Sequence, residues 1–206
     1  MLRSGPHKMV RATLPEPRQD GDASVERCIW RRRSVRSFRD RALTLEQLGQ
    51  VLWAAQGVTG ADARRAVPSA GALYPLELYV AVWKIISLAP GIYRYRPEGH
   101  QLLPVISDHR RETLVDAVHG QEWIATAPAV VCIAAVFERT TMKYGSRGRG
   151  YVYMEAGHAA ESLILQAVAL DLAATVVGAF SDGGVARLLR LKPDETPLCL
   201  IPVGAP

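Results

Sequence analysis

The sequence has few cysteines and no long apolar segment, and each shortage excludes a class of protein. Its three cysteines, Cys28, Cys132 and Cys199, lie far apart among the 206 residues. Their odd number and wide spacing argue against a disulfide framework and a structural zinc site, so we expect no bound metal and a reducing, cytoplasmic location. The longest nearly unbroken apolar run, residues 127–137, is too short to cross a bilayer. Residues 1–24 lack the apolar stretch of a signal peptide, so we expect no membrane association.

The sequence also lacks the usual fingerprints of dinucleotide-binding and hydrolytic enzymes. It contains no G-x-G-x-x-G, no Walker A loop and no G-x-S-x-G. Its five histidines are scattered and form no H-E-x-x-H pair. The run Glu155-Ala156-Gly157-His158 is compatible with catalysis, but a lone histidine on a helix is more often structural. A dinucleotide-binding Rossmann site is therefore not expected.

The chain does have enough apolar residues for a substantial core, since 49% of its residues are hydrophobic. We expect an irregular arm over residues 1–24 and a single domain over residues 25–206. Helical and strand patterns mix in this domain without strict βαβ alternation, which favours an α+β fold. The expected helices are 25–33, 44–57, 107 or 108 to about 119, 137–142, 151–170 and 182–189. The expected strands are 76–86, 91–95, 101–106, 129–136, 173–180 and 197–203, with loops at 60–75 and 145–150.

Local signals support several of these elements. Thr44, with Gln47 three residues later, predicts a capping box at the start of the second helix. Residues 97–99, Pro-Glu-Gly, are typical of the turn in a hairpin. The continuous apolar run 129–136 predicts a buried central strand. Small residues repeat along one face of 151–170, so this helix lies in the core, the simpler interpretation, or in a dimer interface.

Positive charge is concentrated in one short segment. Residues 25–41 carry seven arginines against two acidic residues, an excess equal to the whole formal net charge of +5. A guanidinium group can donate hydrogen bonds to two phosphate oxygens at once, and the hydroxyl group of Ser34 is a further donor. The segment is therefore a candidate anion site. From charge alone, a solvated basic helix end is an equal alternative. We expect no nucleic-acid partner, because the chain shows no recognition helix and no aromatic-stacking pattern.

Three stretches together suit flavin mononucleotide (FMN). They are residues 32–38, residues 68–75 before a predicted strand, and residues 177–182 at a predicted strand-to-helix turn. FMN needs arginine and serine for its phosphate, small residues that let backbone approach its ring, and backbone N–H donors for N5 and O4. No single stretch is decisive by its composition.

In this order, the stretches resemble the flavin-dependent nitroreductase superfamily over residues 25–204. The resemblance implies a central antiparallel sheet flanked by helices, built as an intertwined homodimer with two FMN molecules at the subunit interface. It also implies a small-molecule substrate, with NAD(P)H as a candidate electron donor. The cofactor-binding residues that it implies are Arg32, Arg33, Ser34, Arg36, Pro68, Ser69, Ala70, Leu73, Gly178 and Ala179.

A narrower resemblance is to the SagB-type dehydrogenases, which include azoline oxidases of peptide natural-product pathways. Azoline oxidases carry a catalytic Lys-Tyr pair before the long helix, and Lys143-Tyr144 stands there in this sequence. The resemblance implies that this pair removes a ring proton while a hydride passes to the flavin. The alternative is a surface lysine and a packed tyrosine. The segments that carry this resemblance are residues 52–57, 68–77, 90–95 and 155–158.

The sequence departs from the family pattern at two places. Asp171-Leu172-Ala173 stands where relatives often have Gly-Leu-Gly, and residues 204–206 include no basic residue of the kind many relatives carry after the last strand. Both departures favour weaker FMN retention. We expect an FMN-dependent oxidoreductase that works by ping-pong hydride transfer. The alternatives are an azoline oxidase-type dehydrogenase and a low-turnover flavin-binding subunit of a biosynthetic complex.

Overall fold

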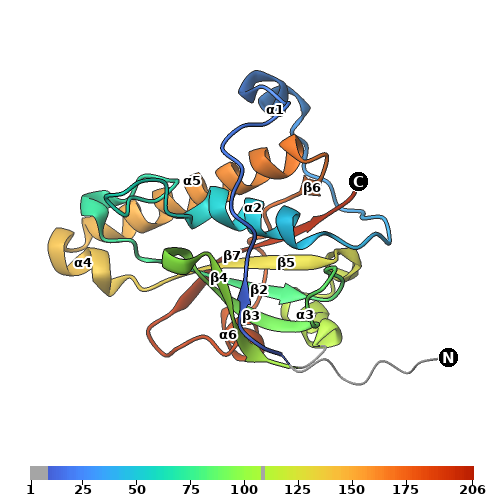
Figure 1. The fold of residues 1–206 in the computed structure, drawn as a ribbon. Coiled ribbons are helices and arrows are strands. Elements are labelled where there is room, and N and C mark those ends of the chain that lie inside the picture. Colours follow the sequence, from blue (N-terminus) through green and yellow to red (C-terminus); the bar gives the residue numbers. More distant parts are fainter. Residues whose placement is uncertain (1–8, 108–109) are drawn as a thin grey trace.

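The computed structural model describes residues 9–107 and 110–206, and an antiparallel sheet of seven strands forms the centre of this part of the chain (Figure 1). The strands are β1 (Ala12–Thr13), β2 (Leu76–Val82), β3 (Gly91–Arg96), β4 (Gln101–Ile106), β5 (Ala129–Ala135), β6 (Ala173–Ala174) and β7 (Thr196–Gly204). Their order across the sheet is β1-β4-β3-β2-β5-β7-β6, and each ladder between neighbours is antiparallel.

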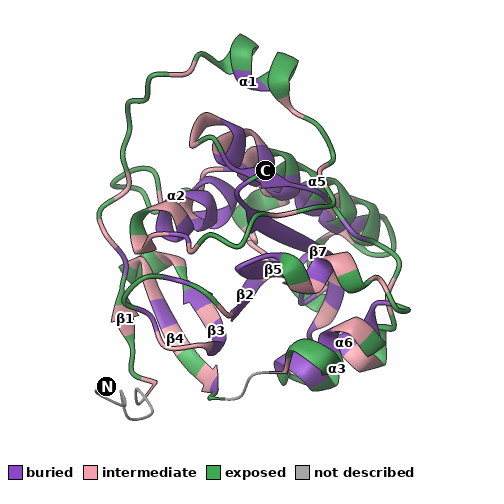
Figure 2. Ribbon diagram, turned by 90° about the vertical axis from the view of Figure 1, so that its right-hand side faces the viewer, coloured by how far each residue is buried: buried purple, intermediate pink, exposed green. Residues whose placement is uncertain are grey.

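Helices cover both faces of this sheet. The α-helices are α1 (Val25–Arg31), α2 (Leu45–Gln56), α3 (Arg111–Ala117), α4 (Glu138–Tyr144), α5 (Arg147–Ala169) and α6 (Asp182–Leu189), and the short 3-10 helices are η1 (Ala70–Ala72), η2 (Pro97–Gly99) and η3 (Glu122–Thr126). The helices α2 and α5 lie together on one face, and α3 and α6 lie against the other (Figure 2). In both views α1 stands away from the rest of the fold.

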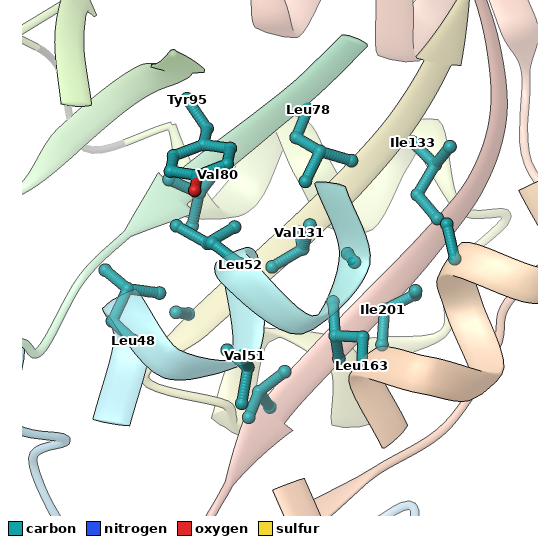
Figure 3. Close-up of a cluster of buried hydrophobic side chains, with 14 of the residues drawn as sticks. Leu48, Val51, Leu52, Leu78, Val80, Tyr95, Val131, Ile133, Leu163 and Ile201 are labelled. Carbon is teal, nitrogen blue, oxygen red and sulfur yellow. The ribbon is translucent and has the colours of Figure 1, made fainter. Parts of the chain in front are cut away.

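The alternation of side chains along the strands gives each face its own core. On β2, Leu78 and Val80 join the cluster beneath α2 and α5, while Tyr79 and Ala81 join the cluster beneath α3 and α6. Figure 3 shows the first cluster, in which Leu52 of α2 packs with side chains of β2, β5 and β7. Removal of this apolar surface from water stabilises the fold by roughly 25 cal/mol per Å².

We expect Leu52→Ala to lower the free energy of unfolding by about 2–5 kcal/mol, because the close-packed neighbours of a fully buried leucine cannot fill the cavity. Chemical denaturation followed by circular dichroism measures the change. The control is Ile86→Ala, since Ile86 is 54% exposed, and it should cost less than about 1 kcal/mol. Equal losses in the two variants would contradict the packing of α2 on the sheet.

The predicted α+β class, with a central antiparallel sheet flanked by helices, is confirmed. Thr44 caps α2 and forms the expected capping box with Gln47, and α2 ends before Gly57. The strands β3 and β4 form the expected hairpin around residues 97–99. The strand β5 lies between β2 and β7, and all of its residues are buried.

The loop expected at residues 145–150 is wrong, because α5 begins at Arg147. Glycine is a poor helix former, so three glycines in six residues indicated a loop. One of them, Gly148, instead lets α5 start close against α4: an added Cβ there would lie 3.0 Å from the carbonyl oxygen of Thr140. A contact between helices thus outweighs the local preference.

Two further expectations are corrected at the edges of the sheet. The strand expected at 173–180 has only two residues, after which the chain meets β7 again at the isolated bridge of Val177. The arm over residues 1–24 is not irregular throughout, because it contains β1, which pairs with the free edge of β4. Of the two starts expected for the helix that forms α3, residue 108 lies outside the described residues, and α3 itself begins at Arg111.

The described part of the chain contains no helix that is long and apolar enough to cross a membrane. Within the same residues, histidine, cysteine, aspartate and glutamate form no group of three or more that could hold a metal ion. The three cysteines are buried and unpaired.

Candidate active site

The predicted site residues fall into two clusters. The arginine cluster comprises Arg32, Arg33, Ser34, Arg36, Gly178 and Ala179, and the loop cluster comprises residues 68–74 with Lys143 and Tyr144. Ser34 forms a bridge with Ala174 of β6, which follows the C-terminal end of α5. The loop cluster includes the end of α4, which precedes the N-terminal end of α5 (Figure 1). Ser34 thus lies beyond the C-terminal end of α5, whereas Lys143 and Tyr144 lie before its N-terminal end, and Arg32 meets the helix between them at Glu161.

In the arginine cluster, Arg32 and Arg33 have different surroundings. Arg32 Nε lies 3.7 Å from Glu161 Oε1, and both side chains are partly exposed. Arg33 turns back on its own helix, and its Nη1 donates to the carbonyl oxygens of Trp30 and Arg32 at 2.9 and 2.7 Å. Arg32 therefore remains available to an anion, whereas Arg33 is already hydrogen-bonded to the backbone.

Arg36 and the backbone of residues 178–179 approach the same segment around η3. The guanidinium carbon of Arg36 lies 6.0 Å from the ring centroid of Trp123 in η3. Gln121, immediately before η3, donates from Nε2 to the carbonyl oxygen of Ala179 at 2.9 Å. An added Cβ on Gly178 would have no atom within 4 Å, so this backbone borders open space.

Asp171, the first departure from the family pattern, ties α1 to the end of α5. Its φ is 52°, a left-handed conformation that glycine adopts most easily. Its carboxylate accepts a hydrogen bond of 2.8 Å from Arg31 Nη2. The ion pair gives the aspartate a structural role beside the arginine cluster.

The loop cluster has a strained backbone. Gly71, Ala72 and Tyr74 have φ angles of 63°, 53° and 46°, and this conformation costs a residue other than glycine roughly 1–2 kcal/mol. The Tyr74 N–H donates to Ser69 Oγ at 2.9 Å, and Arg139 Nη1 donates to the Tyr74 carbonyl oxygen at 2.9 Å. Side-chain hydrogen bonds thus hold both polar groups of the Tyr74 backbone.

The other predicted residues of this loop surround the strained turn. Pro68 is exposed at its start, while Ala70 and Leu73 are half-buried within it. Their backbone is therefore near the surface, where a ligand can reach it.

Lys143 and Tyr144 reach the loop from the end of α4. An added Cβ on Gly71 would lie 2.8 Å from Tyr144 Oη and 2.9 Å from Lys143 Nζ. The Tyr144 ring also meets Tyr151 of α5 edge-on, with centroids 5.2 Å apart. The lysine is exposed and the tyrosine half-buried, yet their polar ends converge on one glycine.

Arg139 supports the loop cluster, and the sequence analysis did not identify it. Besides the Tyr74 carbonyl, it binds Glu77 of β2, with Nη2 2.6 Å from Oε1. Arg94 of β3 contacts the other oxygen of Glu77 at 2.7 Å. Arg139 lies on the first turns of α4 with no motif around it, so its role could not be predicted without knowing that α4 packs beside β2.

Glu155 of α5 is the second residue whose position the sequence analysis missed. It is 3% exposed, and burial raises its pKa to about 7, against the opposing influence of Ser69, Gln56 and Arg65. Helical periodicity is the one feature of the sequence that indicates this burial, because residue 155 lies on the same face of the helix as Val152 and Ala159, which are buried.

A match to a family of oxidoreductases defines the class of this protein. Residues 29–205, most of the chain, match the family model described as the nitroreductase family. The chain therefore belongs to the nitroreductase family. The resemblance drawn from the sequence motifs is confirmed.

Two curated relatives are similar in sequence. MJ1384 of Methanocaldococcus jannaschii, a nitroreductase by name, is 43% identical over 183 residues, which are 89% of this chain and 91% of that protein. The microcin B17-processing protein McbC of Escherichia coli is 28% identical over 138 residues, which are 62% of this chain and 49% of McbC. The match to McbC thus spans about half of that protein.

Solved structures show the same fold. One from Ralstonia eutropha, a nitroreductase by name, has a TM-score of 0.82 at 28% identity and covers 99% of this chain and 95% of that chain. The McbBCD microcin synthetase complex of E. coli, solved with truncated pro-MccB17, contains a chain with a TM-score of 0.75 at 24% identity, covering 97% of this chain and 79% of that one.

Proposed function

We propose that the chain is an FMN-dependent oxidoreductase that acts by a ping-pong mechanism. The observation that carries the proposal is the convergence of Lys143, Tyr144 and the strained turn at Gly71, in a chain of the nitroreductase family that also presents a cluster of arginines. FMN, when bound, supplies the group that accepts and returns the hydride. NADH or NADPH is the proposed donor, and a small organic molecule is the second substrate.

The described residues suit the two ends of FMN. Arg32 and Arg36, with the hydroxyl of Ser34, offer charged and neutral donors to a phosphate. Residues 178–179 offer backbone beside open space, which a flat ring can approach. Because Arg33 is engaged with carbonyl oxygens, we assign it the indirect role of fixing the turn that carries Ser34.

We propose that two copies of the chain share each FMN site, so that the arginine cluster of one faces the loop cluster of the other. The positions of the clusters near opposite ends of α5 support this arrangement. On α1, Val25, Ile29 and Trp30 are 66%, 59% and 76% exposed. Apolar side chains gathered on a projecting helix (Figure 2) are typical of an interface. An intertwined homodimer would bury them.

A second candidate function, oxidation of an azoline ring, is favoured by the contact of Lys143 and Tyr144 with Gly71. In this reaction Lys143 Nζ takes the ring proton, and Tyr144 Oη donates a hydrogen bond or relays the proton. Of the two carbon–hydrogen bonds that must break, one loses its proton to the lysine, and bound FMN would supply the acceptor for the hydride of the other. A nitroaromatic or quinone reductase needs no such base, because its donor already carries the hydride.

Lys143→Ala separates the two functions. We expect turnover of nitroaromatic compounds or quinones with NAD(P)H to remain within a few-fold of wild type, and azoline oxidation to fall about 100-fold or more, the usual contribution of a general base. Steady-state kinetics with both substrate types measure this difference. Lys192→Ala, which removes a lysine distant in sequence on the α6–β7 connection, is the control. Loss of both activities in Lys143→Ala alone would assign the lysine to FMN binding instead.

A third function is that of a flavin-binding subunit with little turnover. It is favoured by the Asp171 departure and by McbC, whose solved structure is a complex with other subunits. This function predicts retained FMN without steady-state turnover by any common donor and acceptor pair.

The experiment that tests the proposal is an absorption spectrum of purified protein before and after soaking with FMN and desalting. Flavin bands near ~450 nm that survive desalting, and that NADH or NADPH bleaches, support the oxidoreductase. Protein that remains colourless after soaking would contradict it. Because the three cysteines are free thiols, we place this activity in the cytoplasm.

A further inference from the structure

A cavity of about 330 Å³ lies behind the loop cluster, and Tyr74 forms part of its wall. The other walls come from α2, β2, β3 and the turn between β3 and β4. Its volume is in the range of small-molecule sites. The charged residues that line it are four arginines and two glutamates: Arg65, Arg94, Arg96, Arg139, Glu77 and Glu98. A cavity so rich in guanidinium groups is a candidate site for an anion.

On one side of this cavity the charges compensate one another. The carboxylate of Glu77 contacts Arg94 at 2.7 Å and Arg139 at 2.6 Å. A second, buried carboxylate, that of Glu195, lies 3.9 Å from Arg94. Two arginines thus meet two glutamates, and this side leaves no positive charge for a ligand.

The other side has two arginines and one glutamate. Arg65 Nη2 lies 2.7 Å from Glu98 Oε1, and Arg96 Nε lies 3.9 Å from Glu98 Oε2. Among the described residues, no second carboxylate lies within ion-pair distance of either arginine. This side of the cavity therefore carries an excess of positive charge.

Arg65 is a fixed and largely buried cation. Its side chain is 12% exposed, its guanidinium carbon lies 5.0 Å from the ring centroid of Tyr74, and its Nη1 donates to the Gln56 carbonyl oxygen at 3.1 Å. The backbone of Arg65 forms a bridge with Val58, just after α2. A buried guanidinium group costs free energy unless an anion pairs with it, so this position requires a carboxylate or a group like it.

Glu98 supplies that carboxylate from an exposed position. It lies on η2, and its side chain is 57% exposed. An exposed carboxylate gains little from an ion pair, because water solvates it well when the pair opens. A carboxylate from outside the chain can therefore replace Glu98 on Arg65 at small cost to the fold.

Gln56 is an independent sign of a ligand at the same cavity. It lines the cavity and is 1% exposed, and neither polar atom of its side-chain amide makes a hydrogen bond within the described residues. A buried amide without a partner costs free energy, which a ligand recovers when it brings a hydrogen-bonding group. The cavity thus offers a cation at one point and an unpartnered amide at another.

We propose that this cavity binds a small carboxylate, and that Glu98 takes the place of the ligand carboxylate until the ligand displaces it. The carboxylate of the ligand pairs with Arg65 and Arg96, and a polar group at its other end bonds to the Gln56 amide. Lys143 and Tyr144 are not among the lining residues, so binding here is independent of the proposed function.

The test is a calorimetric titration of the full-length chain with succinate, a small dicarboxylate, against sodium chloride at the same ionic strength. We expect saturable binding to the wild type and about tenfold tighter binding to Glu98→Gln, because the amide competes less well for Arg65. Arg65→Ala should abolish binding. Glu112→Gln, the same change at an exposed position on α3, should keep the wild-type affinity.

The side-chain amide of Gln56 in the ¹⁵N-labelled chain reports where succinate binds. Its NMR peaks should shift with the midpoint that calorimetry gives. Absence of saturable binding in both the wild type and Glu98→Gln would overturn the proposal. Binding that leaves the Gln56 peaks unmoved, or an equal gain in Glu112→Gln, would overturn it too.

Arg96→Ala keeps the test decisive if Arg65→Ala does not fold. Arg96 is 60% exposed, so its loss should weaken succinate binding several-fold and leave the thermal melt unchanged. Arg187→Ala, at an exposed position on α6, is the matched control and should bind like the wild type. Wild-type affinity in Arg96→Ala would contradict the site. No readout here requires flavin, so a failure to bind FMN would count against the proposed function alone.

Discussion

Replacing Arg32 and Arg36 together by alanine should lower the affinity for FMN by about 100-fold or more. A charge-assisted hydrogen bond contributes about 1.5–3 kcal/mol, and 1.4 kcal/mol changes an affinity tenfold. Among the described residues, Arg32 has a long, partly exposed ion pair with Glu161 at 3.7 Å, and Arg36 lies over Trp123. Their loss therefore removes binding to the ligand with little effect on the fold. Fluorescence titration of FMN measures the affinity.

The matched control is Arg39→Ala with Arg41→Ala. It removes the same two charges from the same basic segment, but from residues outside the predicted motif. We expect its FMN affinity to stay within a few-fold of wild type, since distant exposed charges are screened by salt. Equal losses in the two double variants would show that general positive charge, rather than a built phosphate site, attracts the ligand.

Replacing Gly71 by valine should lower the catalytic efficiency of azoline oxidation about 100-fold or more while the protein stays folded. At a φ of 63° a β-branched residue is a steric outlier, so the turn must change its backbone. The new Cβ would also lie within 2.9 Å of Tyr144 Oη and Lys143 Nζ, which must then move. Misplaced reacting groups lose rate steeply. Steady-state kinetics, with a thermal melt as the folding check, measure the effect.

Gly150→Val is the control for this substitution. Gly150 lies in α5, where an added Cβ meets no atom within 4 Å, and valine is a better helix residue than glycine. We expect its activity and melting temperature to remain close to wild type. Wild-type kinetics in Gly71→Val would show that the loop cluster does not border the reacting groups.

The features predicted correctly from the sequence are those that neighbouring residues decide. The capping box of α2 needs only Thr44 and Gln47, and the burial of β5 follows from its continuous apolar run. The start of α5 was missed because Gly148 belongs to a helix only when α4 lies against it. The short β6 was missed because strand pairing depends on β7, which comes later in the chain.

In the candidate site, too, the features set by neighbouring residues were predicted, and those that depend on distant residues were not. The motifs named the members of both clusters, but not their separation by α5, which appears only when Ser34 meets Ala174 and Gly71 meets Lys143. The left-handed backbone at Ala72 has no signal in its residue type. Glu155 was noticed only as a member of the run 155–158, and its burial was not predicted because it depends on residues far away in the sequence.

The central claim, that two chains share each FMN site, is tested most directly with a mixed dimer. Arg32→Ala/Arg36→Ala and Gly71→Val, each with its own affinity tag, are co-expressed and purified by both tags in turn. In the mixed dimer one site combines both defects, and the other combines two intact clusters. We expect about half of the wild-type activity to return. Mixed dimers as inactive as the parent variants, or a failure of the two chains to copurify, would contradict it.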